Sequence, residues 1–98
     1  MSFQKDPEKS ESKTLHRLVD FAGKRVLEVG CGEGRLTWNY AQAAKQVVGI
    51  DPDSDSLYVA YYDVSADLRK TTTFVCASSL NIPFPSERFD IALLSWSL

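Results

Sequence analysis

The stretch that decides the fold reads Val26-Leu27-Glu28-Val29-Gly30-Cys31-Gly32-Glu33-Gly34-Arg35. Its first part, within 25–29, is short and mostly apolar, which is typical of a buried strand. Three alternating glycines come next, and apolar residues at helical spacing begin directly after them, over 33–44. Glycine in such a turn can adopt a positive φ and lets a ligand approach the backbone. Free N–H groups at the start of the next helix favour an anionic group.

The same alternation of strands and helices continues on both sides of this stretch. We predict a flexible tail over 1–10, followed by a helix that ends at Ala22. The predicted strands cover 25–29, 46–50, 72–76 and 89–94. A helix over 33–44 connects the first two strands, a helix capped by Asp53 or Ser54 and ending near Arg69 connects the next two, and an irregular loop over 77–88 leads to the last. This order predicts an α/β domain over 11–98, with a parallel sheet and right-handed crossovers.

A carboxylate stands at the end of the second predicted strand. Asp51 follows Gly30 by 21 residues, and a carboxylate at that place can accept both hydroxyls of a ribose. It could also serve as a helix cap. A dinucleotide loop needs its third glycine one residue later, where Arg35 stands, so the spacing disfavours a nicotinamide cofactor.

Several motifs together resemble class I methyltransferases that depend on S-adenosylmethionine (SAM). Glu28, Gly30, Gly32 and Gly34 match the four fixed positions of their motif I, E/D-x-G-x-G-x-G. Residues 81–91 are similar to the family's segment before its fourth strand, L-P-F-P-x-x-x-F-D-x-V. Residues 95–98 are similar to the segment after that strand in the small-molecule, type 11-like branch. The resemblance covers residues 26–98 and implies a Rossmann-like sheet in the order 3-2-1-4.

The resemblance also implies a cofactor, SAM with S-adenosylhomocysteine as its product, and a set of residues that hold it. Glu28 would orient the loop and help to hold the amino group of the methionine moiety. The other assignments are Gly30, Cys31, Gly32, Gly34 and Ser95 for the methionine moiety, Asp51 for the ribose, and Pro52, Ser78 and Ser79 for the adenine. The family often has Asp at the position of Ser78, so we expect weaker adenine binding here, because charge-assisted hydrogen bonds are stronger. No catalytic residue is assigned.

Composition excludes several other classes of protein. Apolar residues make up 44% and charged residues 24% of the 98 residues, and the net charge is −2 with scattered cations, which gives no basic surface for nucleic acid. The longest apolar run, 91–94, is too short for a membrane span, and an N-terminus without an apolar signal core predicts a cytoplasmic protein. Cys31 and Cys76 lack the spacing of a metal site, and Cys31 is interpreted as a small spacer.

Only four of the family's seven strands fall within the sequence, so we expect a truncated methyltransferase core. The loop over 77–88 is expected to cover its face of the sheet poorly, and the strand over 89–94 to form an apolar edge that can pair with a second copy. The predicted function is methyl transfer from SAM to a small-molecule acceptor, because the Asn/Asp-Pro-Pro-Tyr motif of many amino-group methyltransferases is absent at 95–97. The alternatives are a SAM-binding module or fragment without activity of its own and, less favoured, a nicotinamide- or nucleotide-binding domain.

Overall fold

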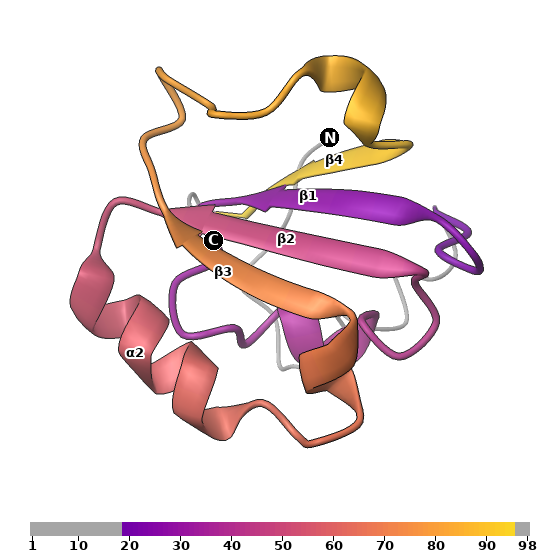
Figure 1. Cartoon of the computed structure of the whole chain (residues 1–98), viewed down its shortest axis with the longest axis horizontal. Helices are drawn as coiled ribbons and strands as arrows, with labels where there is room; N and C mark the ends of the chain where they lie inside the picture. The colour runs from indigo at the N-terminus through magenta and orange to yellow at the C-terminus, as the bar shows by residue number, and fades with distance from the viewer. Residues whose placement is uncertain (1–18, 96–98) are drawn as a thin grey trace.

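A four-stranded parallel sheet forms the centre of the molecule (Figure 1). The computed structural model describes residues 19–95, so the predicted tail over 1–10 and the body of the first predicted helix lie outside the described residues. The strands are β1 (Arg25–Val29), β2 (Gln46–Asp51), β3 (Thr72–Cys76) and β4 (Ile91–Leu94). Their order is β3-β2-β1-β4, and all three pairings are parallel. The predicted Rossmann-like order is therefore confirmed.

The connection from β1 to β2 is not the helix that the sequence predicts over 33–44. It is a series of turns with one short 3-10 helix, η1 (Thr37–Asn39). Some amides of this segment donate to carbonyls three residues back and others to carbonyls four residues back. The reason is tertiary: the side chains of Thr37 and Tyr40 both bond to Glu28 of β1, and these bonds override the helical propensity of the alanines.

The helix after β2, α2 (Ser54–Asp63), begins where the sequence predicts and ends earlier than the predicted end near Arg69. Asp53 is its N-cap, and its Oδ1 accepts from the amide of Asp55 at 3.1 Å. At Val64 the backbone becomes extended and the side chain is buried, which ends the helix. The chain continues through the 3-10 turn η2 (Leu68–Lys70), and the loop predicted as irregular contains another, η3 (Ser86–Arg88).

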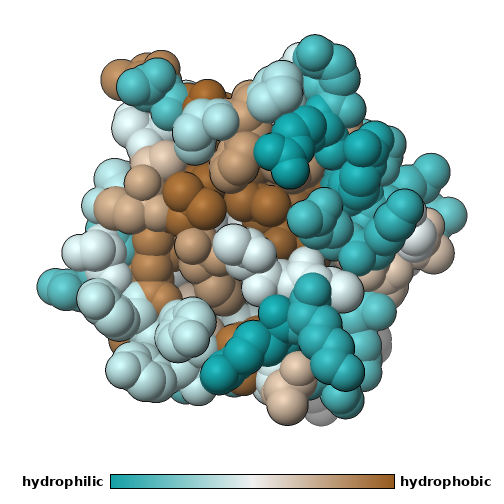
Figure 2. Space-filling model, in the orientation of Figure 1, coloured by the Kyte–Doolittle hydropathy of each residue, from teal (hydrophilic) through white to brown (hydrophobic). Residues whose placement is uncertain are grey.

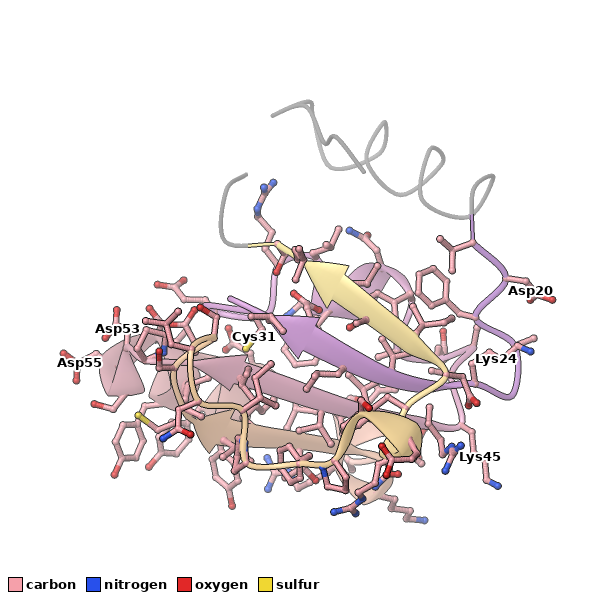
Figure 3. All side chains as sticks on the ribbon, turned by 90° about the horizontal axis from the view of Figure 1, so that it is seen from above. Asp20, Lys24, Cys31, Lys45, Asp53 and Asp55 are labelled. Carbon is pink, nitrogen blue, oxygen red and sulfur yellow. The ribbon has the colours of Figure 1, made fainter. Side chains whose placement is uncertain are left out.

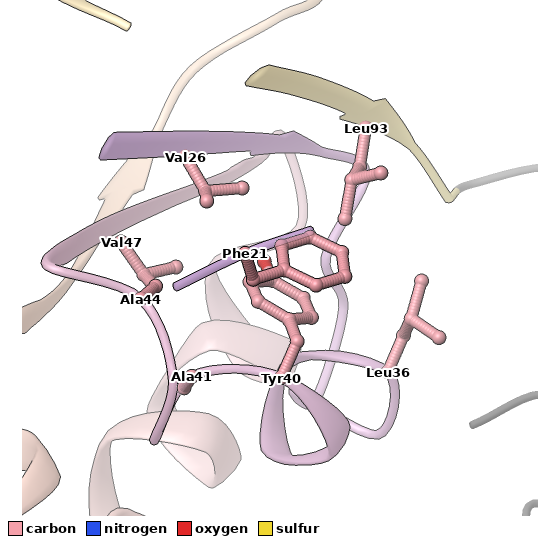
Figure 4. Close-up of a cluster of buried hydrophobic side chains, with 8 residues drawn as sticks. All are labelled: Phe21, Val26, Leu36, Tyr40, Ala41, Ala44, Val47 and Leu93. Carbon is pink, nitrogen blue, oxygen red and sulfur yellow. The ribbon is translucent and has the colours of Figure 1, made fainter. Parts of the chain in front are cut away.

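One face of the sheet packs against the segment that comes after the glycine loop. Figure 4 shows Val26, Val47 and Leu93 from three adjacent strands pointing toward the rings of Phe21 and Tyr40. Those two rings are stacked with their centroids 4.6 Å apart. The complete cluster consists of Phe21, Val26, Leu36, Tyr40, Ala41, Ala44, Val47 and Leu93.

The opposite face is covered by the loop between β3 and β4, and the expectation of poor cover is wrong for the central strands. Leu27 and Ile50 are buried there, with exposed fractions of 6% and 0%, in a cluster against which Phe84 and Phe89 of the loop pack. Cover is thinner toward β4, where Leu94 is 52% exposed. Figure 2 shows hydrophobic residues gathered in a hollow at the middle of the molecule. A cavity of about 370 Å³ lies between the loop and β4, lined among others by Phe84 and Ala92.

An ion pair fastens the amino ends of β1 and β4 to each other. The guanidinium of Arg25 donates to both carboxylate oxygens of Asp90, at 3.2 and 3.3 Å, and the Arg25 amide donates to Oδ2 at 2.9 Å. In return, the amide of Asp90 donates to the carbonyl of Arg25 at 2.8 Å. These contacts set the register from which β4 begins, with Ile91 opposite Val26.

We expect Asp90→Asn to lower the melting temperature at neutral pH and to have little effect near pH 2. Hydrogen bonds from the Arg25 side chain and backbone lower the pKa of Asp90 from 3.8 to about 2. Because the folded-state pKa is the lower one, this stabilisation is complete above about pH 4 and is lost as the pH falls through about 2. Melting curves of both proteins across this range provide the test. A difference that does not change with pH would contradict the assignment.

Candidate functional site

The glycine loop is anchored to the carboxyl end of the sheet by its own backbone amides. The amides of Gly30 and Cys31 both donate to the carbonyl of Ile50, at 2.8 and 3.1 Å. Gly30, Gly32 and Gly34 have φ angles of +79°, +54° and +87°, which confirms the predicted positive φ. Figure 3 shows Cys31 and Asp53 at this end of the sheet, and Lys24 and Lys45 at the other.

Gly32 and Gly34 have different structural roles. A Cβ on Gly34 would lie 2.7 Å from Cζ2 of Trp38, so this glycine makes room for the indole. A Cβ on Gly32 would meet no heavy atom within 4 Å, so the backbone of Gly32 faces open space. A ligand can therefore approach the chain at Gly32, whereas Gly34 is required for packing.

Asp51 joins the glycine loop to the start of α2. Its Oδ2 accepts from the amide of Gly32 at 3.0 Å, and its Oδ1 accepts from the amide of Asp53 at 2.8 Å. The cap of α2 is Asp53, so the alternative of Asp51 as that helix's N-cap is wrong. Each carboxylate oxygen has a second lone pair, and both can therefore still accept a hydroxyl.

The expected anion site after the glycine loop is absent from the described structure. No α-helix comes directly after the loop, so there is no helix N-terminus with free amides. The amide of Gly32 is bonded to Asp51, and that of Gly34 donates to the carbonyl of Cys31 at 3.0 Å. The amides of Gly32 and Gly34 are therefore occupied within the chain, and that of Gly32 holds a carboxylate.

Two cavities meet at Gly30. The first, of about 320 Å³, is lined by Val29, Gly30, Asp51, Pro52, Ala77, Ser78 and Ser79. The second, of about 310 Å³, is lined by Glu28, Gly30, Cys31, Gly32, Glu33, Arg35, Leu36 and Ser95. Every predicted site residue except Gly34 lines one of them. The sequence analysis did not single out Glu33 and Arg35 as lining residues, because nothing in the motif distinguishes them from ordinary surface charges.

Glu28 is the only acidic side chain that is fully buried among the described residues, with an exposed fraction of 0%. Thr37 and Tyr40 donate hydroxyl hydrogen bonds to its Oε1, at 2.7 and 2.6 Å. Its Oε2 lies 2.8 Å from Oγ of Ser95. Burial raises the pKa of Glu28, and the hydrogen bonds from Tyr40, Thr37 and Ser95 oppose that rise. Sequence reasoning missed Thr37 and Tyr40, although a carboxyl group in a buried strand signals that donors must exist.

Cys31 is a packing residue in this arrangement. Its Sγ would lie 2.9 Å from a Cβ built on Gly49, so the thiol fills the space that this glycine leaves. Burial, followed by the charges of Glu28 and Asp51, raises the pKa of the thiol far above its usual range. The geometry favours the spacer interpretation over a nucleophile. Within residues 19–95 no group of His, Cys, Asp and Glu side chains is suited to hold a metal ion.

A parallel sheet with a glycine loop after β1 and an acid after β2 defines a Rossmann-like domain for a nucleoside-containing cofactor. The profile of a family described as "Methyltransferase domain" matches residues 26–98. The chain therefore belongs to the methyltransferase domain family, whose cofactor is SAM.

Relatives and solved structures agree with this family. Phosphoethanolamine N-methyltransferase 1 of Triticum aestivum is 35% identical over 97 residues, which cover 96% of this chain and 19% of the relative. Protein arginine N-methyltransferase 1 of Dictyostelium discoideum is 38% identical over 78 residues, which cover 78% of this chain and 23% of the relative. The solved structure of a putative SAM-dependent methyltransferase from Listeria monocytogenes superposes with a TM-score of 0.72 at 26% identity. The superposition covers 89% of this chain and 39% of that protein. The chain thus spans well under half the length of these proteins.

We expect Gly34→Ala to destabilise the fold more than Gly32→Ala. Both substitutions place a side chain at positive φ, which costs about 1–2 kcal/mol. Only Gly34→Ala also collides with Trp38, and overpacking adds about 1–3 kcal/mol. Urea unfolding of the two variants provides the measurement. Equal losses of stability would show that Trp38 does not depend on this glycine.

Proposed function

We propose that residues 11–98 form the cofactor-binding part of a methyltransferase and hold SAM across the two cavities, for methyl transfer to a small-molecule acceptor. The observation that carries the proposal is the meeting of the two cavities at Gly30, with Asp51 in one and Glu28 in the other. A cofactor with a nucleoside at one end and an amino acid at the other matches that division.

The first cavity suits adenosine. Asp51 has lone pairs left for the two ribose hydroxyls, and Pro52 offers an apolar surface to the adenine. Ser78 and Ser79 lie at the adenine edge in this proposal. Oγ of Ser78 already accepts from the amide of Leu80 at 3.1 Å, which leaves one lone pair for the adenine amine. This supports weaker adenine binding than an aspartate would give.

The second cavity suits the methionine moiety. Glu28 and Ser95 offer oxygens toward the amino group, and the open backbone at Gly32 leaves room beside them. SAM supplies an activated methyl group on a sulfonium. The contribution of these residues is then to bind and orient the cofactor, because in-line displacement depends strongly on placement. We assign no general base, and a SAM-binding module without catalysis is the alternative.

A small-molecule acceptor is favoured by Ser95, which stands where many amino-group methyltransferases have Asn or Asp. The relatives include both kinds of acceptor, since one is named for phosphoethanolamine and another for protein arginine. The net charge of −2 argues against a nucleic-acid acceptor.

No helix in the part of the chain that the structure describes has the length and apolarity needed to cross a bilayer.

Thermal unfolding in the presence of ligands tests the proposed cofactor. SAM and S-adenosylhomocysteine should raise the melting temperature, because binding to the folded state alone adds about 2.7 kcal/mol at a hundredfold excess over Kd. Asp51→Ala should abolish the shift relative to its own ligand-free curve, whereas Asp55→Ala, in the first turn of α2, should keep it. NAD should have no effect. A folded protein that neither SAM nor S-adenosylhomocysteine stabilises, or that NAD stabilises more, would overturn the proposal.

We also propose that β4 pairs with its counterpart in a second copy. It is at the edge of the described sheet, and Leu94 is 52% exposed there. Such an apolar edge is a template for strand pairing, and a lysine on it prevents pairing. Sedimentation velocity should show a dimer for the native chain and a monomer for Leu94→Lys. A native chain that is monomeric at all concentrations would reject this assembly.

A further inference from the structure

We propose that Glu28 is a neutral carboxylic acid before SAM binds, and that it gives up its proton to solvent when the ammonium group of the cofactor binds. The inference rests on the proposed function, because the ammonium group belongs to the methionine moiety of SAM. Binding of SAM would then release one proton to solvent, and the number of protons released can be measured.

The hydrogen bonds around Glu28 require more protons than its partners supply. Four short oxygen–oxygen contacts connect this group: Thr37 to Oε1 at 2.7 Å, Tyr40 to Oε1 at 2.6 Å, Ser95 to Oε2 at 2.8 Å, and Ser95 to the carbonyl of Gly30 at 2.9 Å. Four two-centre hydrogen bonds require four protons, and the three hydroxyls supply only three. A carbonyl and an ionised carboxylate supply none.

A proton on Oε2 of Glu28 completes the set. Glu28 then donates to Oγ of Ser95, and Ser95 donates to the carbonyl of Gly30, while Thr37 and Tyr40 donate to Oε1. All four short contacts become hydrogen bonds, and only the longer contact between Oγ of Ser95 and the carbonyl of Val29, at 3.4 Å, has no proton of its own. With an ionised Glu28, the single proton of Ser95 would have to serve two acceptors at once.

Burial and the acidic neighbours of Glu28 favour the same state, whereas its three hydrogen bonds and Arg35 oppose it. Burial raises the pKa of Glu28 and is the largest influence on it. Tyr40, packed against it from the segment after the glycine loop, has its own pKa raised well above 10 and stays neutral. Cys31 is likewise held neutral. Asp51 and Glu33 add carboxylates on the side of the glycine loop, and Arg35 adds a cation that is exposed to solvent and lines the same cavity.

Binding of an ammonium group reverses this preference. The O–H bond of Glu28 breaks, its proton passes to solvent, and the buried carboxylate gains a cation, without which its charge would be costly. The hydroxyl of Ser95 can then turn from the carbonyl of Gly30 to Oε2 of Glu28. That leaves the Gly30 carbonyl, in a residue that lines both cavities, as an acceptor for the ammonium group.

Isothermal titration calorimetry of the full chain with S-adenosylhomocysteine measures the proton directly. Titrations in buffers of different ionisation enthalpy, from about pH 5.5 to 7, give the number of protons released; the ligand's α-amino group, with a pKa of about 8, remains an ammonium there. We expect release approaching one proton at the acid end. There the affinity should rise about tenfold per pH unit.

Three comparisons separate this proton from other sources. Glu28→Gln should fold, because its amide oxygen can accept from Thr37 and Tyr40 while its NH₂ group donates to Ser95. It should bind without proton release. Asp55→Asn, which changes an exposed carboxylate outside both cavities, should release the proton as the native chain does. 5′-Methylthioadenosine, which lacks the amino acid, should bind the native chain without release.

A cofactor-free measurement keeps the inference distinct from the proposed function. The infrared difference spectrum between the native chain and Glu28→Gln at pH 6 should contain the carbonyl stretch of a protonated carboxylic acid. A carboxylate band instead, or S-adenosylhomocysteine binding without proton release at pH 5.5, would overturn the inference while leaving the cofactor site intact. A protonated Glu28 in a chain that does not bind S-adenosylhomocysteine would overturn the proposed function and with it the coupling.

Discussion

The buried carboxyl group of Glu28 is the constraint on which the rest of this structure depends. β1 lies between β2 and β4, and a polar group in the middle of that strand cannot be left without partners, because an unsatisfied buried group is costly. Its partners come from two distant segments: Thr37 and Tyr40 after the glycine loop, and Ser95 after β4. One side chain thus fixes where both segments lie, and the glycine loop runs between them.

β1 and β4 are fastened to each other at both ends. The ion pair of Arg25 and Asp90 holds the amino ends, and Ser95 holds the carboxyl ends through Glu28 and the carbonyl of Gly30. The long loop from β3 to β4 is therefore fixed at its far end. Because it also packs Phe84 and Phe89 on the sheet, it positions Ser78 and Ser79 beside the first cavity. The loop between β3 and β4 thus both covers one face of the sheet and lines the first cavity.

Patterns that depend on a local preference predicted the structure well, and those that a distant contact decides did not. The strands, the positive φ of the glycines and the cap at Asp53 arise from residues close in sequence. The strand order, which pairs β1 with the distant β4, was implied by the family resemblance. The segment over 33–44 has helical spacing, yet bonds to Glu28 impose turns on it. Sequence reasoning likewise underestimated the loop over 77–88, because the packing of Phe84 on the second face leaves no periodic signal.

The placement of the candidate residues illustrates the same limit. The sequence pattern identified many of the residues that line the two cavities, since glycine and acid positions reflect backbone geometry. It did not reveal that Gly34 serves Trp38, or that Glu28 needs three hydroxyl groups, because those partners are brought together only by the fold. The sequence therefore pointed to residues that the structure brings together around the two cavities, whereas the hydrogen-bond network of Glu28 required the structure.

The electrostatics of the site explain why this glycine loop suits SAM better than a dinucleotide. A pyrophosphate needs free amides, but the amides of Gly30, Gly32 and Gly34 are bonded within the chain. Figure 3 shows Asp53 and Asp55 at the carboxyl end of the sheet and Lys24 and Lys45 at the opposite end. Together with the carboxylate of Asp51, these acids would repel phosphates. A sulfonium and an ammonium group are positive, so carboxylates that would repel a pyrophosphate would attract these two groups of SAM.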